Sequence, residues 1–97
     1  MNDLAANTKI LIVDDKPLNI EVLSETIEDL GDILFATNGQ AAIDLCIEQQ
    51  PNLVLLDVMM PEMDGYEVCE KLKALPETKE IPVIFATALS DENDEAK

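Results

Sequence analysis

Residues 53–65 read LVLLDVMMPEMDG, and this stretch decides how the chain folds. Its first four residues, Leu53–Leu56, form a short uncharged apolar run that is typical of a buried strand. Burial of a strand on both faces is the habit of a parallel sheet covered by helices. Asp57 follows at the carboxyl end of the strand, where open α/β sheets bind their ligands. Pro61 lacks an N–H and cannot continue a central strand, and Asp64 is placed to cap a following helix.

Three further apolar runs predict the remaining strands, and helical patterns lie between them. The runs cover Ile10–Val13, Ile33–Ala36 and Ile81–Ala86. The alternation of strands and helices predicts an α/β fold with a doubly wound parallel sheet. Apolar residues at helical spacing predict three helices. The first runs from Pro17 to a stop at Gly31, with the apolar stripe Ile20, Leu23, Ile27 and Leu30. The second covers Gln40–Gln49, with Ala42, Leu45 and Cys46 on its buried side, and the third follows Gly65 and ends at Pro76, with the apolar residues Tyr66, Cys69, Leu72 and Leu75.

The composition indicates one small acidic domain. The 97 residues include 21 acidic side chains against six lysines and no histidine, for a net charge of −15. Such a charge argues against nucleic acid or an anionic membrane as a direct partner, and it is compatible with cation binding or with a plain solvated surface. We expect residues 1–8 to form a loose tail and residues 9–97 to form the domain. No apolar run approaches the length of a membrane span and no secretory signal is present, so we expect a cytoplasmic protein.

The two cysteines are predicted to be structural. Cys46 and Cys69 both fall among apolar neighbours in helical patterns. We therefore interpret them as small core residues rather than as a disulfide or a metal-binding pair. A zinc site is not expected in a chain without histidine.

Carboxylates end two of the predicted strands, and a hydroxyl ends a third. Asp14 and Asp15 follow the first strand, Asp57 follows the third, and Thr87 follows the fourth. We expect these groups to share one crevice, because ligands bind at the carboxyl ends of the strands in such sheets. Each has a plainer explanation when taken alone: a helix N-terminal pair, a strand cap and a β-branched strand-end residue. Their co-occurrence is what indicates a functional site.

Three converging carboxylates repel one another and raise one another's pKa unless a cation lies between them. Magnesium fits such a site, with manganese as a substitute, because it takes oxygen ligands from a few carboxylates and keeps other positions for water or a phosphate oxygen. The backbone carbonyl of Met59 is a further candidate ligand. The cation would hold a phosphoryl donor against Asp57, whose carboxylate can act as the nucleophile and give an aspartyl phosphate. The Thr87 hydroxyl could then bond a phosphate oxygen.

Three segments resemble the receiver domain of bacterial two-component response regulators. They are residues 10–17 (ILIVDDKP), 53–65 (LVLLDVMMPEMDG) and 81–88 (IPVIFATA). The resemblance covers nearly the whole chain from Lys9 onward. It implies a flavodoxin-like fold with the strand order 2-1-3-4-5.

The resemblance also implies roles for individual residues and partners. A sensor histidine kinase or a phosphotransfer protein would be the phosphoryl donor, and it would dock around the first helix near Leu18 and Ile20. An output domain or effector outside this chain would respond. The implied site residues are Asp57 as phosphoacceptor; Asp14, Asp15, Asp57 and the Met59 carbonyl as magnesium ligands; Thr87 as the switch hydroxyl; and the Ala88 amide as a phosphate contact.

The chain departs from the family pattern at its carboxyl end. The family has a fifth strand ending in a lysine that pairs with the phosphoryl group, and Lys97 comes too early to be that lysine. The chain therefore resembles a receiver with the fifth strand and the last helices missing. Without them the fourth strand would be a sheet edge, and such an apolar edge is a template for self-association.

Two other interpretations compete with a working phosphoacceptor. A magnesium-dependent hydrolase of the haloacid dehalogenase type would need a second acid two residues after the nucleophile, where this chain has Met59. A structural pseudo-receiver, or an interaction fragment that cannot be phosphorylated because the lysine strand is absent, is the remaining alternative. A pseudo-receiver would be expected to have lost an acidic residue of the site, and none is lost here.

Overall fold

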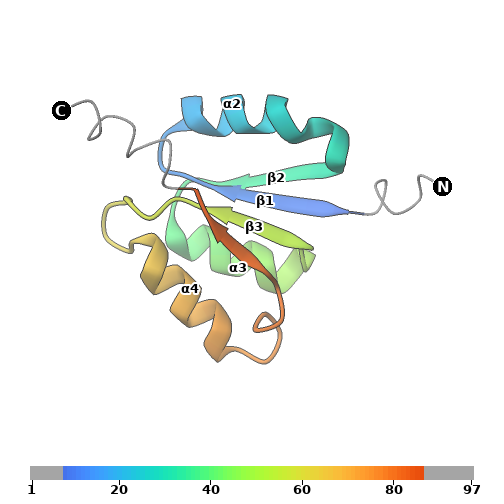
Figure 1. Cartoon of the computed structure of the whole chain (residues 1–97). Helices are drawn as coiled ribbons and strands as arrows, with labels where there is room; N and C mark the ends of the chain where they lie inside the picture. Colours follow the sequence, from blue (N-terminus) through green and yellow to red (C-terminus); the bar gives the residue numbers. More distant parts are fainter. Residues whose placement is uncertain (1–7, 87–97) are drawn as a thin grey trace.

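The computed structural model describes residues 8–86, which form a four-stranded parallel sheet flanked by helices (Figure 1). The strand order is β2-β1-β3-β4, as expected for the first four strands of a doubly wound sheet. None of the helices in residues 8–86 is long and apolar enough to cross a membrane. The elements in chain order are β1 (Lys9–Val13), α2 (Pro17–Ile27), the 3₁₀ turn η1 (Glu28–Leu30), β2 (Asp32–Ala36), α3 (Gly39–Gln49), β3 (Leu53–Leu56), α4 (Gly65–Ala74) and β4 (Val83–Phe85).

The main core lies between the sheet and the helices α3 and α4, which cover one face while α2 lies on the other (Figure 1). Side chains alternate between the two faces along each strand. Leu11 and Val13 of β1 therefore enter this core, whereas Ile10 and Ile12 face the α2 side, and all four are buried. The remaining buried members of the core are Ala36, Ala42, Ile43, Cys46, Val54, Leu56, Met60, Val68, Leu72 and Ile81.

The starts of α2 and α4 follow the predicted chemistry, and α3 has a side-chain cap of the same kind as α4. Pro17 occupies the first turn of α2, where its missing N–H costs no hydrogen bond. The side chain of Asn38 accepts a hydrogen bond from the Ala41 N–H at the start of α3. Asp64 caps α4 in the same way through the Glu67 N–H, at 2.9 Å. Each cap satisfies a backbone donor that has no partner within the helix.

The predicted stripe of the first helix is wrong at its end. The α-helix stops at Ile27 and continues as the 3₁₀ turn η1. A 3₁₀ turn has three residues per turn, so the direction of the side chains no longer follows the α-helical stripe. Leu30 is consequently 57% exposed, and Ile20 is the only buried residue of α2.

The threefold spacing predicted for α4 is also wrong as a description of its buried face. Steps of three residues in a helix with 3.6 residues per turn fall short of a full turn by about 60° each. Tyr66 therefore points away from Leu72 and is exposed, with its ring centroid 5.1 Å from that of Phe85. The buried face consists of Gly65, Val68 and Leu72, at spacings of three and four.

Burial of the central strand on both faces is only half correct. Val54 and Leu56 of β3 are fully buried toward α3 and α4, whereas Leu53 and Leu55 are only partly buried on the α2 side. A single helix covers that side within residues 8–86 (Figure 1). Ile84, which pairs with Leu55 in the sheet, is 53% exposed for the same reason. The fourth strand is also shorter than predicted, because regular pairing covers Val83–Phe85 alone.

Candidate functional site

The ends of β1 and β3 bring the predicted carboxylates together. Because β1 and β3 are paired, with Val13 opposite Leu56, the residues that follow these two strands lie next to each other. The Asp57 N–H donates to the Val13 carbonyl at 2.9 Å, and the Asp14 N–H donates to the Ala36 carbonyl at 3.1 Å. These backbone bonds continue the sheet by one residue and fix where both aspartates begin.

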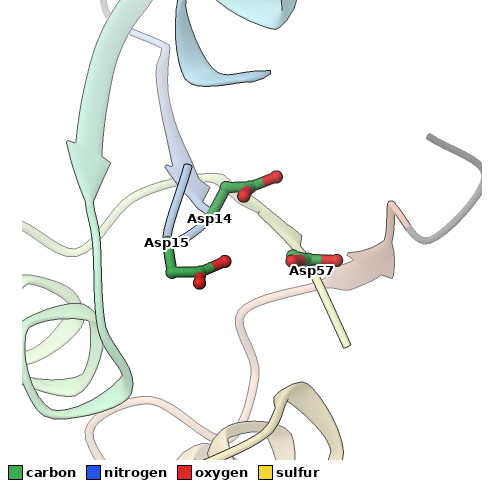
Figure 2. A group of neighbouring side chains, drawn as sticks. All are labelled: Asp14, Asp15 and Asp57. Carbon is green, nitrogen blue, oxygen red and sulfur yellow. The ribbon is translucent and has the colours of Figure 1, made fainter. Parts of the chain in front are cut away.

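Asp14, Asp15 and Asp57 form one acidic cluster, as predicted (Figure 2). One carboxylate oxygen from each lies within 4.8 Å of the others. Asp14 and Asp57 are each 1% exposed, whereas Asp15 is partly exposed. The cluster is therefore closed toward the sheet and open on the side of Asp15.

One oxygen of Asp57 is buried without a partner. Its Oδ1 accepts a hydrogen bond from the Met59 N–H at 3.3 Å. Its Oδ2 is buried and has no hydrogen-bond partner among residues 8–86, the only such side-chain atom found there. Buried polar atoms are nearly always satisfied, so an orphaned carboxylate oxygen indicates a position intended for a ligand.

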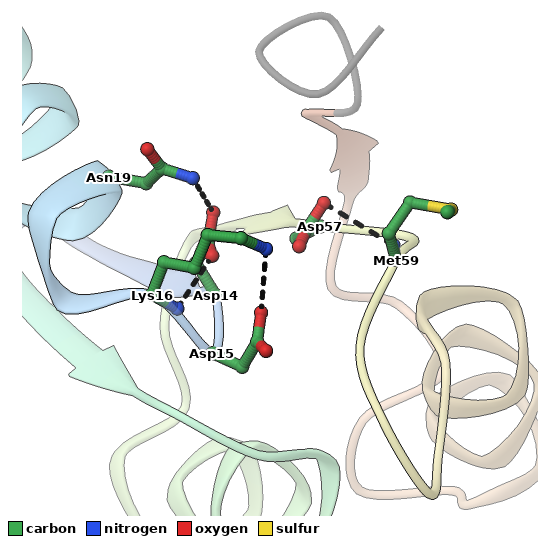
Figure 3. Close-up of polar contacts among 6 residues, drawn as sticks. All are labelled: Asp14, Asp15, Lys16, Asn19, Asp57 and Met59. Atoms are coloured by element: carbon green, nitrogen blue, oxygen red, sulfur yellow. Dashed lines mark hydrogen bonds and ion pairs between the residues drawn. The ribbon is translucent and has the colours of Figure 1, made fainter. Parts of the chain in front are cut away.

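Two residues that the sequence analysis did not single out hold the cluster in place (Figure 3). Both oxygens of Asp14 accept hydrogen bonds, Oδ1 from the Lys16 backbone N–H at 2.9 Å and Oδ2 from the Asn19 side chain at 3.2 Å. The Lys16 ammonium lies 3.3 Å from Asp15 Oδ1. A lysine directly after two aspartates could have been recognised in the sequence as their counter-charge. The role of Asn19 depends on the pitch of α2 and had no comparable indication.

Burial and repulsion make ionisation of Asp57 unfavourable. Burial is the largest cause of its raised pKa, and the nearby charge of Asp14 adds to the effect, with a smaller contribution from Asp15. The Met59 N–H and the charge of Lys16 oppose the increase. The pKa of Lys16 is raised in turn, first by its hydrogen bond to Asp15. Within residues 8–86, the three carboxylates of the cluster thus carry more negative charge than Lys16 balances.

The loop after Asp57 depends on a glycine. Gly65 begins α4, and its N–H donates to the Val58 carbonyl at 3.0 Å. A Cβ at position 65 would overlap the Asp57 carbonyl oxygen and lie 2.8 Å from the Val58 Cα. The absence of a side chain therefore lets the helix start directly against the backbone of Asp57, which positions the carboxylate relative to α4.

The donor set fits a hard divalent cation. Three carboxylates converge, one oxygen is buried without a partner, and one side of the cluster is open. Magnesium takes oxygen ligands of this kind from one or two carboxylates and retains water in its other positions. A cation would satisfy Asp57 Oδ2 and offset the mutual repulsion of the carboxylates.

The structure describes some of the remaining predicted residues and not others. Thr87 and Ala88 lie outside the described residues. The Met59 backbone follows Asp57 closely enough for its N–H to bond the carboxylate, and ligation by its carbonyl stays a prediction. Of the two residues predicted for partner docking, Leu18 is 69% exposed, whereas Ile20 is buried and cannot form a docking surface.

Comparisons with known proteins agree with this geometry. A probable cyclic di-GMP phosphodiesterase of Vibrio cholerae is 45% identical over 95 residues, which are 98% of this chain but 21% of that protein. The signal receiver domain of a histidine kinase from Syntrophus aciditrophicus is 41% identical, with a TM-score of 0.76 over 92% of this chain and 68% of that one. The receiver domain of the sensor histidine kinase PA1611 of Pseudomonas aeruginosa, described with a magnesium ion in its active-site cleft, is 26% identical, with a TM-score of 0.77 over 92% and 75% of the two chains.

The family comparison covers most of the chain. The model of the response regulator receiver domain matches residues 10–97, which include the acidic cluster and all residues of the four strands except Lys9. The chain spans about a fifth of the length of the Vibrio relative, so that protein's activity is not carried over with the likeness. The chain belongs to the response regulator receiver domain family.

Proposed function

We propose that this domain accepts a phosphoryl group on Asp57, with a divalent cation held by the acidic cluster. We further propose that phosphorylation switches the conformation of the domain and so controls an output outside the chain. One observation carries the proposal: a buried carboxylate oxygen without a partner lies at the end of the central strand, beside two further carboxylates. The magnesium ion described in the Pseudomonas receiver domain supports the choice of cation.

In the proposed phosphoryl transfer, different residues of the site have different roles. In the transfer step one oxygen of Asp57 attacks the phosphorus of the donor, the bond from phosphorus to the donor's leaving group breaks, and an acyl phosphate forms. A cation at this site would be held by Asp14, Asp15, Asp57 and the Met59 carbonyl. A bound magnesium ion supplies charge neutralisation for the phosphoryl oxygens. Lys16 N–H and Asn19 keep Asp14 oriented toward the cluster.

Two residues beyond the described range complete the proposed site. Thr87 and Ala88 follow β4, which pairs with β3 directly beside Asp57. We assign the Thr87 hydroxyl as the switch group that turns toward the phosphoryl oxygens and the Ala88 N–H as a second donor to them. This assignment rests on their match to the family motif.

The proposed partners follow from the family. A sensor histidine kinase or a phosphotransfer protein supplies the phosphoryl group, and the exposed side chain of Leu18, at the start of α2 beside the cluster, is the proposed contact. A cytoplasmic location belongs to the same proposal. Direct binding of nucleic acid by this domain is disfavoured by its net charge of −15.

Phosphorylation by a small donor tests the proposal. The chain is incubated with Mg²⁺ and a small acyl phosphate, and its intact mass is measured beside that of Asp57→Asn. We expect one added phosphoryl group in the chain and none in the variant. A third protein, extended by a lysine-bearing fifth strand from a relative, tests the alternative of an interaction fragment without phosphorylation competence. Labelling of the extended protein alone would favour that alternative for this chain, and equal labelling of Asp57→Asn would contradict the acceptor assignment.

A further inference from the structure

Among the lysines of the described residues, Lys16 is the one that contacts the acidic cluster. Its ammonium lies 3.3 Å from Asp15 Oδ1, and its charge also acts on Asp14 and Asp57. The side chain extends across the mouth of the cluster instead of away from it (Figure 3). Two other lysines in the described part of the chain are engaged elsewhere, Lys9 with Gln49 and Lys73 with the carbonyls of the turn before β4.

The Lys16 side chain is not needed for the local fold. Its ammonium makes a single contact, to Asp15, and the two side chains are 55% and 27% exposed. The structural work at this position is done by the backbone, because the Lys16 N–H donates to Asp14 Oδ1 and its carbonyl accepts from Asn19 and Ile20 at the start of α2. Both kinds of contact persist whatever side chain stands at position 16.

A divalent cation and the Lys16 ammonium would both bind the Asp15 carboxylate. Asp15 belongs to the cluster whose three carboxylate oxygens lie within 4.8 Å of one another, so a cation bound there comes close to the ammonium. Two positive charges at such a separation repel, and the separation is shorter than the screening length of about 8 Å at physiological salt. Binding of the cation therefore requires the lysine to leave Asp15 and turn into solvent.

We propose that Lys16 is a tethered counter-ion that competes with the divalent cation for Asp15 and so sets the metal affinity of the cluster. The inference rests on the proposed function for the identity of the cation. In the cation-free protein Lys16 partly neutralises the carboxylates, and in the loaded protein it is displaced. The lysine thus keeps the affinity of the site lower than its three carboxylates alone would give.

Magnesium titration of matched variants tests the proposal. Lys16→Met keeps the length of the side chain and removes its charge, and Lys16→Arg keeps the charge. Lys71→Met removes one charge from the last turn of α4, at the end of the helix opposite to Gly65, which touches the Asp57 backbone. Dissociation constants for Mg²⁺ are measured by calorimetry and by amide NMR shifts, with the NMR spectra also reporting the fold. We expect Lys16→Met to bind Mg²⁺ about three- to tenfold more tightly than the unmodified chain. Lys16→Arg and Lys71→Met should stay within about twofold of the unmodified chain.

The outcomes separate this inference from the function on which it rests. Equal affinities in Lys16→Met and Lys71→Met, with Mg²⁺ bound by both, would overturn the role of Lys16 and leave the metal site standing. Weaker binding in Lys16→Met would overturn it as well. Failure of every variant and of the unmodified chain to bind Mg²⁺ would contradict the metal site itself, and the inference with it. Should Lys16→Met fail to fold, Lys16→Gln gives the same comparison.

Discussion

Replacing Asp57 by asparagine should stabilise the cation-free protein, although it removes the residue proposed to carry the function. Asp57 is 1% exposed and lies beside Asp14 and Asp15. The variant keeps an oxygen that can accept from the Met59 N–H, and it places an amide donor where Oδ2 now has no partner. It therefore removes the charge repulsion and replaces a buried charged oxygen by a neutral amide group, in one change of nearly constant volume.

The size of the effect follows from the separation of the carboxylates. Two unit charges 4.8 Å apart repel by about 0.9 kcal/mol at the dielectric constant of water and by about 3.5 kcal/mol at an effective value of 20. Asp57 takes part in two such pairs, and the attraction of Lys16 offsets some of their repulsion. We expect the free energy of unfolding to rise by about 1–3 kcal/mol at neutral pH in Asp57→Asn.

The stabilisation by Asp57→Asn should depend on pH, because the Asp57 carboxyl titrates and the asparagine amide does not. The folded protein raises the Asp57 pKa above its ordinary value of 3.8. A carboxyl group with a raised pKa contributes stability below the ordinary pKa, and this stability is lost as the pH rises through the higher pKa of the folded state. The stabilisation by Asp57→Asn should therefore be small near pH 3 to 4 and grow toward its full value as the pH increases.

Urea unfolding measured by far-ultraviolet circular dichroism tests this prediction, since the chain has no tryptophan. The measurements use a chelator, several pH values and the control Asp29→Asn, which removes one exposed charge from η1. Excess Mg²⁺ should narrow or reverse the difference, because a ligand of the folded state stabilises only the protein that binds it. An Asp57→Asn variant no more stable than Asp29→Asn in the chelator would refute the reasoning.

Three further predictions concern the rest of the domain. Gly65→Ala should destabilise the chain by about 2 kcal/mol or more, since the new Cβ would meet the backbone of Asp57 and Val58, which cannot move aside. Gly39→Ala should cost less, because the three nearest atoms to its new Cβ belong to the side chains of Met63 and Val68. Urea unfolding of both variants tests the difference, and equal costs would contradict it. A thiol reagent at pH 8 should label Cys69 before Cys46, because Cys46 is fully buried and burial raises its pKa to about 11. Mass spectrometry of the labelled peptides gives the order of labelling. Faster labelling of Cys46 would contradict the prediction and show that the core around Cys46 opens. The chain should self-associate through β4, because this strand carries the exposed Ile84, and self-association should increase at high salt, because salt screens the net charge of −15. Light scattering on a sizing column, across salt and protein concentrations, tests this prediction. A monomer in every condition would contradict it.

The sequence predicted the topology and the acidic cluster because both depend on local patterns. Apolar runs ending in aspartate mark the ends of β1 and β3, and parallel pairing then leaves those ends few other places to lie. The directions of individual side chains were harder to predict from the sequence. The exposure of Leu30 depends on a change from α-helix to 3₁₀ turn, which no residue between Ile27 and Gly31 specifies alone. The contact of Asn19 with Asp14 depends on the exact approach of α2 to the sheet, which only the three-dimensional structure contains, whereas the contacts of Lys16 with Asp14 and Asp15 are local in the sequence.

Mapping the phosphorylated residue is the sharpest test that Asp57 is the phosphoacceptor. The chain is phosphorylated with a small acyl phosphate and Mg²⁺, the acyl phosphate is trapped by chemical reduction, and the peptides are analysed by mass spectrometry, with Asp29→Asn as a control that should label normally. We expect the modification on Asp57 alone, although Asp14 and Asp15 are within 4.8 Å, because both oxygens of Asp14 accept hydrogen bonds and Asp15 pairs with Lys16. Modification of Asp14 or Asp15 in its place, or undiminished labelling of Asp57→Asn, would contradict it.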